Sequence, residues 1–599
     1  MTTIDRRVFL SGLAGSLFVG PASKVGAADQ QYPPSSSTPQ PPQADSSGVC
    51  WLDVAAPFVA VDPSQQMSTE LLLTATCFPG VDGFQNAHNG TQYQILLYDA
   101  SGKEIKLESN GKLSIPALRP TVVNLKEWTG RDSFFGGAKV RVAPSPNQVL
   151  RAGDLFSAGF VRWNLPRNFD NVHAHPAPMQ QVIGHYNYSM PFPSLAEYHC
   201  AFALFNPNEE ESTGVIRAVD RLGQTGAERP YRLQPHQTLL YTLADLRPAA
   251  TPAEALALAP LNNLKLKDGG VIVVRNDSDR VAFGYTFMKG RQGESFTVEH
   301  PLHFSADAPM KAARSTPYGP NRSFPAQALI YTPLLFRGLR VAGLELESRI
   351  YLSSSRWVEA ALWKMPFVTT AEGRIAWVSN RDERLADRVQ PASATDQGVI
   401  RLAEFQSCRI DVGDLPLPAG FSGGFGVACI PKTSHSLNKV EVRALNWGRV
   451  AFTHFRPGGA IAKGYRQVQE RGNLASDYIV TGAHISGTAA NRKRDCLLAI
   501  MNIEFEDDYT GTPKLQLFGP SGLLEERQLS DFPPLACRHL LLSELFPNAQ
   551  SDPSHPFTVR MMARNALMVV SALHIDYERK DIALEHGSDR HSTFADFKC

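Results

Sequence analysis

The chain has 599 residues, of which 43% are hydrophobic and 20% charged, with 59 Lys and Arg against 58 Asp and Glu. This length suggests about three to five domains, and the balanced charge argues against nucleic acid as the main partner. The 45 Gly and 43 Pro favour many short strands over long helices. We therefore expect a soluble, multidomain, all-β protein.

The first 28 residues have the pattern of an export signal. Arg6 and Arg7 precede a short apolar run at 8–20, and Val25-Gly26-Ala27 offers a small-residue cleavage site. This arrangement resembles a bacterial twin-arginine (Tat) signal peptide, which implies export by the Tat translocase to the periplasm or beyond. The alternative is an ordinary amphipathic N-terminal helix, which the glycines of this segment disfavour.

Residues 29–49 form a Pro-, Ser- and Gln-rich segment that lacks the apolar residues a core requires. We expect a disordered linker here, between the cleaved signal and the folded part. No later segment has 18 uninterrupted apolar residues, so no membrane span is expected after cleavage.

An internal repeat organises the rest of the chain. The clearest match aligns 198–290 with 494–580, where Cys200 matches Cys496 and Asn206 matches Asn502. Each copy has an alternating strand, an acidic loop and a Gly-containing hairpin turn in the same order. Two weaker copies follow the same plan. The expected units are 50–190, 191–310, 311–480 and 481–599.

Apolar and polar residues alternate at period two in all four units, which predicts strands with one buried face. Turn signals recur about every 8–12 residues, as a sandwich of about seven strands requires. The mature chain therefore resembles tandem immunoglobulin-like (Ig-like) antiparallel β-sandwich repeats, with no specific family identified. The segment from Thr251 to Leu256 alone is expected to be helical, with Thr251 as N-cap and Pro252 in the first position.

Histidines provide the best chemical lead. Four of the 16 His fall between Asn171 and Cys200. If this segment is extended, His173 and His175 point to one face, and His185 and His199 could complete a shell around one Cu or Zn ion. The alternative is a polar loop between repeats. The multicopper oxidases repeat H-x-H and add an H-C-H stretch, so the single H-x-H here excludes that resemblance.

Two other patterns carry less weight. Residues 420–424 match G-x-S-x-G, but an apolar strand-like run follows, so we expect a glycine-rich connection in a β repeat rather than a hydrolase. The acidic loops at 208–211 and 504–508 offer carboxylates for Ca²⁺, but neither has the calcium-loop pattern, and solvated loops are favoured.

Eight Cys follow the signal, an even number in an oxidising destination. Bridges from Cys408 to Cys429 and from Cys496 to Cys537 would each lie within one repeat. Alternatively, the equivalent Cys200 and Cys496 are small buried hydrophobic residues.

Two functions fit these features. The first is an exported, non-catalytic β-sandwich repeat protein with a structural or binding role in the periplasm or at the cell surface, its partner an unidentified protein or polysaccharide. The alternative is a periplasmic metal-binding protein or metalloenzyme that uses the His cluster near 173–199. The chain has no P-loop, dinucleotide fingerprint, H-E-x-x-H or C-x-x-C, which favours the first.

Overall fold

The computed structural model describes residues 3–4 and most of 49–597. The segments outside this description are 5–48, 77–90, 144–149, 152–158, 177–186, 301–327, 354–361, 378–399, 431–437, 459–475, 505–508 and 590–595, with a few shorter gaps. Most of the described residues lie in antiparallel strands and few lie in helices, which confirms the all-β prediction. Two two-residue pairings lie outside the units defined below: β1 (Thr3–Ile4) with β25, and β9 (Leu150–Arg151) with β42 (Asp596–Phe597).

Four successive units account for the other elements. Unit 1 contains β2 (Leu52–Asp62), β3 (Met67–Leu73), β4 (Thr91–Asp99), β5 (Glu104–Ile105), η2 (Glu108–Gly111), β6 (Lys112–Ile115), β7 (Thr121–Asn124), α2 (Leu125–Thr129), β8 (Phe134–Ala143), β10 (Phe160–Asn164), β11 (Phe169–His173) and β12 (His175–Pro176). Unit 2 contains β13 (Asn187–Phe192), β14 (Tyr198–Phe205), β15 (Ser212–Asp220), β16 (Thr225–Leu233), β17 (Thr238–Thr242), β18 (Arg247–Ala249), α5 (Pro252–Leu256), η3 (Leu264–Leu266), β19 (Gly270–Asn276), β20 (Phe283–Gly290) and β21 (Phe296–Glu299).

The second half of the chain follows the same order. Unit 3 contains β22 (Ala328–Val341), β23 (Leu344–Ser353), β24 (Leu362–Thr369), β25 (Ile375–Trp377), β26 (Ile400–Leu402), β27 (Ser407–Asp411), η5 (Val412–Asp414), β28 (Phe421–Ile430), β29 (Asn438–Ala444), β30 (Arg449–His454) and β31 (Arg456–Gly458). Unit 4 contains β32 (Ser476–Ala483), β33 (Ser486–Thr488), β34 (Asn491–Asn502), β35 (Lys514–Gly519), β36 (Gly522–Gln528), β37 (Cys537–Leu541), α8 (Leu542–Leu545), β38 (Phe557–Ala563), β39 (Met568–Asp576), β40 (Asp581–His586) and β41 (Ser588–Asp589).

The four units share one strand topology, which confirms the predicted sandwich repeats. Apart from short additional strands, each unit has eight strands in a common order, and the ordinal numbers used below refer to these eight. The first (β2, β13, β22, β32) pairs with the sixth (β8, β19, β28, β38) in every unit. The second strand (β3, β14, β23, β34) pairs with the seventh (β10, β20, β29, β39) in every unit. The seventh pairs in turn with the eighth (β11, β21, β30, β40). We call the sheet face built on the second, seventh and eighth strands the front sheet of a unit.

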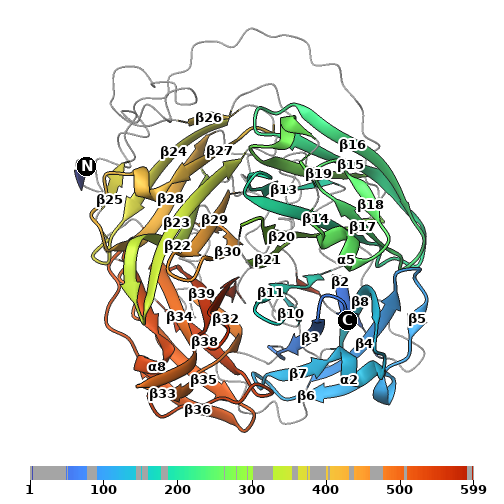
Figure 1. Ribbon diagram of the computed structural model, residues 1–599. Coiled ribbons are helices and arrows are strands. Elements are labelled where there is room, and N and C mark those ends of the chain that lie inside the picture. The colour runs from blue at the N-terminus through green and yellow to red at the C-terminus, as the bar shows by residue number, and fades with distance from the viewer. Residues whose placement is uncertain are drawn as a thin grey trace.

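The units form a closed ring around a common centre, with unit 4 beside unit 1 (Figure 1). The front sheet of each unit packs against the preceding unit, so both of its faces are buried. On β14, Cys200, Phe202 and Leu204 face the core of unit 2, whereas Ala201 and Ala203 join the core of unit 1. The eighth strands line the centre of the ring, where each contacts the eighth strands of the two neighbouring units.

Several local expectations can be compared with the structure. Helix α5 begins at Pro252, and the Thr251 hydroxyl accepts a hydrogen bond from the backbone N–H of Glu254, as predicted. The expectation that this segment alone is helical was wrong, because α2 and α8 are also short helices. Residues 421–424 of the G-x-S-x-G segment are already part of strand β28, so this stretch is a strand of the β repeat and not the glycine-rich connection that was expected. Strands β13 and β32 each cross a proposed unit boundary, at 190/191 and at 480/481. Within the described residues, no helix has the length and hydrophobicity needed to cross a membrane.

Four cysteines have side chains within the described part of the chain, and all four are free thiols. Cys200, Cys408, Cys496 and Cys537 are buried and unpaired as disulfides, so neither Cys408–Cys429 nor Cys496–Cys537 forms. Cys537 lies opposite Met501 on the neighbouring strand, five residues along β34 from Cys496, which is a separation of about 17 Å. A disulfide requires Cα atoms within about 7 Å. The alternative prediction, that the equivalent Cys200 and Cys496 are small buried hydrophobic residues, is confirmed, because each lies in the core of its unit.

Candidate metal centre

A histidine stands at the end of the eighth strand in all four units. His173, His454 and His586 are the last residues of β11, β30 and β40, and His300 directly follows β21. Because the eighth strands meet at the centre of the ring, the four imidazoles come together there. All four residues are buried, with exposed fractions between 2% and 5%.

We call His173, His300, His454 and His586 the central histidines. Ring nitrogen atoms of neighbouring members of this cluster lie close to one another. The Nε2 atoms of His300 and His586 are 3.1 Å apart. Ligand nitrogens of His300, His454 and His586 all lie within 4.8 Å of one another. A tetrahedral Zn²⁺ with Zn–N bonds of about 2.0–2.1 Å separates its ligand nitrogens by about 3.3 Å. These three side chains therefore converge at nearly the spacing of a transition-metal site.

His173 occupies a different place in the cluster. Its Nε2 lies 3.3 Å from Nδ1 of His586 and 3.1 Å from the backbone oxygen of His586, while its Nδ1 lies 3.4 Å from the Ser588 hydroxyl. The Tyr285 hydroxyl of unit 2 donates to the backbone oxygen of His173 at 2.7 Å. A metal-bound imidazole commonly uses its second nitrogen for a hydrogen bond that sets its orientation. His173 is placed to provide that bond to His586.

Carboxylates near the centre belong to ion pairs and hydrogen bonds beside it. A cavity of about 10 Å³, the space of a single small occupant, is lined by His173, His300 and His586 together with neighbours that include Glu299 and Glu585. Glu299 lies 3.3 Å from Lys439 Nζ, and Glu585 lies 3.1 Å from His574 Nε2. Burial raises the pKa of both carboxyls and lowers the pKa of Lys439. Because side chains alternate along a strand, Glu585 points to the opposite face of β40 from His586.

The structure places the predicted metal ligands in different surroundings. His173 belongs to the central histidines. His199 lies on β14, where burial lowers the pKa of its imidazole and its Nε2 is 2.7 Å from the backbone oxygen of Ala255 in α5. His175 is paired through its backbone with Ala55, and its side chain lies outside the described residues, as does all of His185.

Sequence reasoning missed His300, His454 and His586. The search for ligands within one segment favoured neighbours of His173, whereas its partners come from the other three repeats. A signal was present, because each missed histidine ends or directly follows the eighth strand of its repeat. Aligning the repeats at these ends would have placed all four in one column.

The acidic loops proposed for Ca²⁺ are engaged otherwise where they are described. Glu209 accepts a hydrogen bond from Lys139 Nζ at 2.8 Å, and Glu211 pairs with Arg232. The equivalent Asn206 and Asn502 side chains hold their loops by donating to backbone oxygens. In the described part of the chain, the central histidines supply the one group of three or more candidate metal ligands.

Comparison with known proteins adds no assignment. No protein-family model matches the chain, and no curated protein has significant sequence similarity to it.

Proposed function

We propose that this protein binds one transition-metal ion, Cu or Zn, at the central histidines, with His300, His454 and His586 as ligands and His173 as the residue that orients His586. The observation that carries the proposal is the convergence of one histidine from each of the four repeats on a single buried point. Each unit ends its eighth strand in the same residue type, although the surrounding sequences differ.

The donor set determines which ions fit. Imidazole nitrogen suits Zn, Cu, Ni and Fe, whereas Ca²⁺ and Mg²⁺ require oxygen ligands. The nearest carboxylates are held by Lys439 and His574, so they supply no competing oxygen shell. Three histidine ligands also leave one position of a tetrahedral ion for water or a small molecule. The proposal is a binding function, and we assign no catalytic step to it.

Elemental analysis of the purified protein tests the proposal. We expect about one equivalent of Cu or Zn per chain, lost in His300→Ala and His454→Ala. The His173→Ala variant should keep the ion with affinity lowered by about 10–100-fold, because it removes an orienting bond rather than a ligand. His555→Ala is the control, since His555 is exposed in a loop and bonded to Asp552.

Two results would contradict the metal proposal. One is a folded wild-type protein that contains no metal and takes up neither Cu nor Zn when these ions are added. The other is full occupancy in the His300 and His454 variants. Circular dichroism and thermal melts establish that each variant is folded, and reloading of chelator-treated wild-type protein provides the same information if a variant fails to fold.

We further propose that the protein reaches the periplasm or the cell exterior through the Tat translocase. The support is the Arg6-Arg7 pair with its short apolar run and small-residue cleavage site. The Tat route carries folded proteins, which suits a centre whose residues come from different units. Replacing both arginines with Lys should leave the protein in the cytoplasm, as cell fractionation would show. Unchanged arrival of the shortened protein in the periplasm would refute the assignment.

A further inference from the structure

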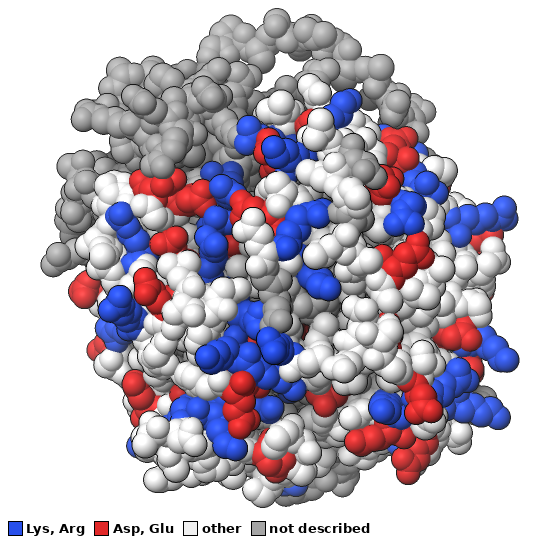
Figure 2. Space-filling view, in the orientation of Figure 1, with Lys and Arg blue, Asp and Glu red and all other residues white. Residues whose placement is uncertain are grey.

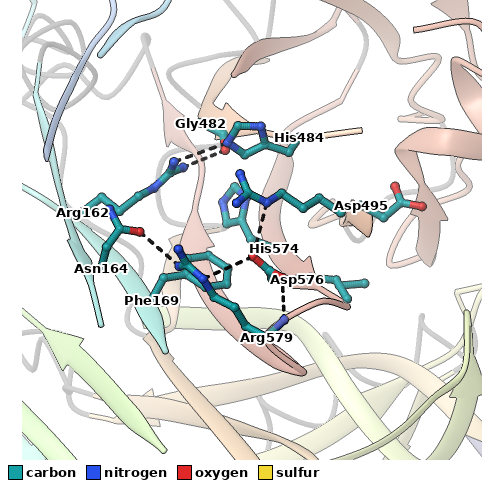
Figure 3. Close-up of a pocket in the computed structure, with 11 residues that line it drawn as sticks. Arg162, Asn164, Phe169, Gly482, His484, Asp495, His574, Asp576 and Arg579 are labelled. Atoms are coloured by element: carbon teal, nitrogen blue, oxygen red, sulfur yellow. Dashed lines mark hydrogen bonds and ion pairs between the residues drawn. The ribbon is translucent and has the colours of Figure 1, made fainter. Parts of the chain in front are cut away.

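The seam between units 4 and 1 contains a pocket lined by three arginines (Figure 3). Arg162 comes from β10 of unit 1, Arg494 from β34 and Arg579 from the turn between β39 and β40 of unit 4. The pocket has a volume of about 30 Å³ and also includes His484 and His574. Figure 2, in the orientation of Figure 1, shows Lys and Arg side chains gathered near the middle of the molecule, over the junction of units 4 and 1. We call this feature the arginine pocket.

Arg162 is a buried cation without a matching carboxylate. It is only 5% exposed. One of its Nη atoms donates to the backbone oxygen of Gly482 at 2.9 Å, and the other lies 3.4 Å from Nε2 of His484. Its Nε–H has no hydrogen-bond partner, and no Asp or Glu in the described part of the chain forms an ion pair with it. Burial lowers the pKa of this guanidinium, so its charge is held here at a free-energy cost.

The backbone of β32 is shaped around this side chain. Gly482 has φ of +82°, and an added Cβ would lie 2.7 Å from a guanidinium nitrogen of Arg162. The register of β32 with β38 shifts between Thr481 and Ala483, which marks a bulge at this glycine. Arg162 is therefore seated in a specific recess of unit 4 rather than trapped between two flat sheets.

The other units show what normally fills this position. Counting from the central histidine, Arg162 of unit 1 corresponds to Glu441 of unit 3, because Phe160 pairs with His173 and Lys439 with His454. In the same way, Glu70 opposite Arg162 corresponds to Arg349 opposite Glu441. The same position in units 2 and 4 is Phe287 and Leu573, which lie in apolar cores.

In the seam between units 2 and 3, the buried carboxylate has a cation and hydrogen-bond donors as partners. Glu441 lies 3.5 Å from Arg349 and accepts hydrogen bonds from the hydroxyls of Tyr198 at 2.9 Å and Tyr351 at 2.5 Å. In unit 1 the charges are exchanged between the two strands, but Glu70 forms no such pair with Arg162. The seam between units 4 and 1 therefore has a cation, Arg162, at the position where the seam between units 2 and 3 has a carboxylate, Glu441, that is fully paired.

Positive charge is in excess around the arginine pocket. Asp576 is the carboxylate that faces the arginines, 3.3 Å from Arg494 and 3.8 Å from Arg579. Asp495 points away and accepts a hydrogen bond from the Ser543 hydroxyl at 2.5 Å. Glu70 and Glu585 also act on Arg162 from a distance. Glu585 is already bonded to His574 and Asn171.

We propose that the arginine pocket binds a small oxyanion, a carboxylate or phosphate group, on the Nε–H edge of Arg162 between Arg494 and Arg579. Guanidinium groups recognise carboxylate and phosphate through paired N–H···O bonds, and such charged hydrogen bonds are stronger than neutral ones. The ligand supplies the negative charge that Glu441 supplies in the equivalent seam. This site is distinct from the proposed metal centre and requires no metal.

The test uses full-length, chelator-treated protein, so that its outcome is independent of metal binding. Calorimetry and thermal melts with inorganic phosphate and with acetate, at ionic strength held constant with chloride, should show saturable binding of at least one anion. Arg162→Met should weaken that binding at least about tenfold, since it removes the charged donor. Without anion, the same variant should melt at or above the wild-type temperature, because the buried charge is gone. Arg340→Met is the control, since Arg340 is exposed at 84%.

Each outcome bears on the proposal. Binding of phosphate alone, or of acetate alone, would support it and identify the class of anion. Neither anion acting saturably, or both acting equally on wild type and Arg162→Met, would overturn it. If Arg162→Met fails to fold, Arg579→Gln at the partly exposed side of the pocket replaces it, again with at least about a tenfold loss expected. A failed metal assay together with intact anion binding would reject the metal centre alone.

Discussion

Single residues join the units of this ring at its centre, and Asp581 is the clearest case. Its carboxylate accepts a hydrogen bond from the backbone N–H of Phe169 in unit 1 at 2.8 Å and lies 3.5 Å from Arg449 of unit 3. Asp581 itself belongs to unit 4 and is 1% exposed. Burial raises the pKa of this carboxyl from 3.8 to about 7, against the lowering effects of the Phe169 bond and Arg449. One side chain thus connects three units, and the burial that this requires disfavours its ionised form.

This raised pKa predicts a pH dependence of stability. Between about pH 4 and pH 7 the folded state binds more protons at Asp581 than the unfolded state does, so the free energy of unfolding falls as the pH rises through this window. A shift of about three pKa units corresponds to about 4 kcal/mol over the full window. The Asp581→Asn variant cannot titrate and should show a smaller decrease between pH 4 and pH 7.

Urea unfolding of metal-free wild type and Asp581→Asn across this range is the measurement. Other buried carboxyls with raised pKa values, such as Glu299 and Glu441, contribute equally to both proteins. The difference between the two curves therefore isolates Asp581. A difference that stays constant with pH would show that Asp581 is ionised throughout, held by Arg449 and the Phe169 amide.

At the scale of strands, period-two patterning predicted which residues face the core of their own unit, as Cys200, Phe202 and Leu204 do on β14. It could not predict what covers the second face, because alternation separates two faces without identifying the partner of either. Ala201 and Ala203 fit close against unit 1, and their small size is the sequence sign of that contact.

The central histidines show the same limit. Local spacing brought His173 to attention, because an H-x-H pair on an extended strand is visible within one segment. Its actual neighbours are His300 and His586, which in turn contact His454, and all of these are brought near His173 only by closure of the ring. The disulfide pairs proposed from sequence were wrong for a related reason. Cysteines of one repeat were matched by proximity in the chain, whereas strand register sets their separation.

At the scale of the whole molecule, the four seams differ in how much apolar surface they share. Units 1 and 2 share one large apolar core, and units 3 and 4 share another. The seam between units 2 and 3 combines a smaller apolar contact, in which Tyr351, Val450 and Phe452 join the core of unit 2, with the buried charge of Glu441. The seam between units 4 and 1 contains the buried charge of Arg162 beside a small apolar cluster. We therefore expect the molecule to behave as two halves of two units each.

This division predicts which fragments fold. Residues 328–589, units 3 and 4, keep an apolar seam and should be soluble with one cooperative thermal transition. Residues 187–458, units 2 and 3, have a similar length but expose both of the large apolar seams, including Phe287 and Phe336, and should aggregate. Size-exclusion chromatography and thermal melts compare the two. Equal behaviour of the fragments would mean that the seams do not differ in strength.

The seam between units 4 and 1 also has a kinetic consequence. The Phe169–Asp581 hydrogen bond joins residues 412 apart in the chain, whereas the Tyr285–His173 bond between units 1 and 2 joins residues 112 apart. The added entropy of closing the longer loop is only about 1 kcal/mol, but contacts so distant in sequence form late during folding. The arginine pocket and the position of His173 beside His586 depend on this last contact. A nascent or partly refolded chain would therefore lack the arginine pocket and the bond that orients His586, and the ability to capture an anion would arise only at the end of folding.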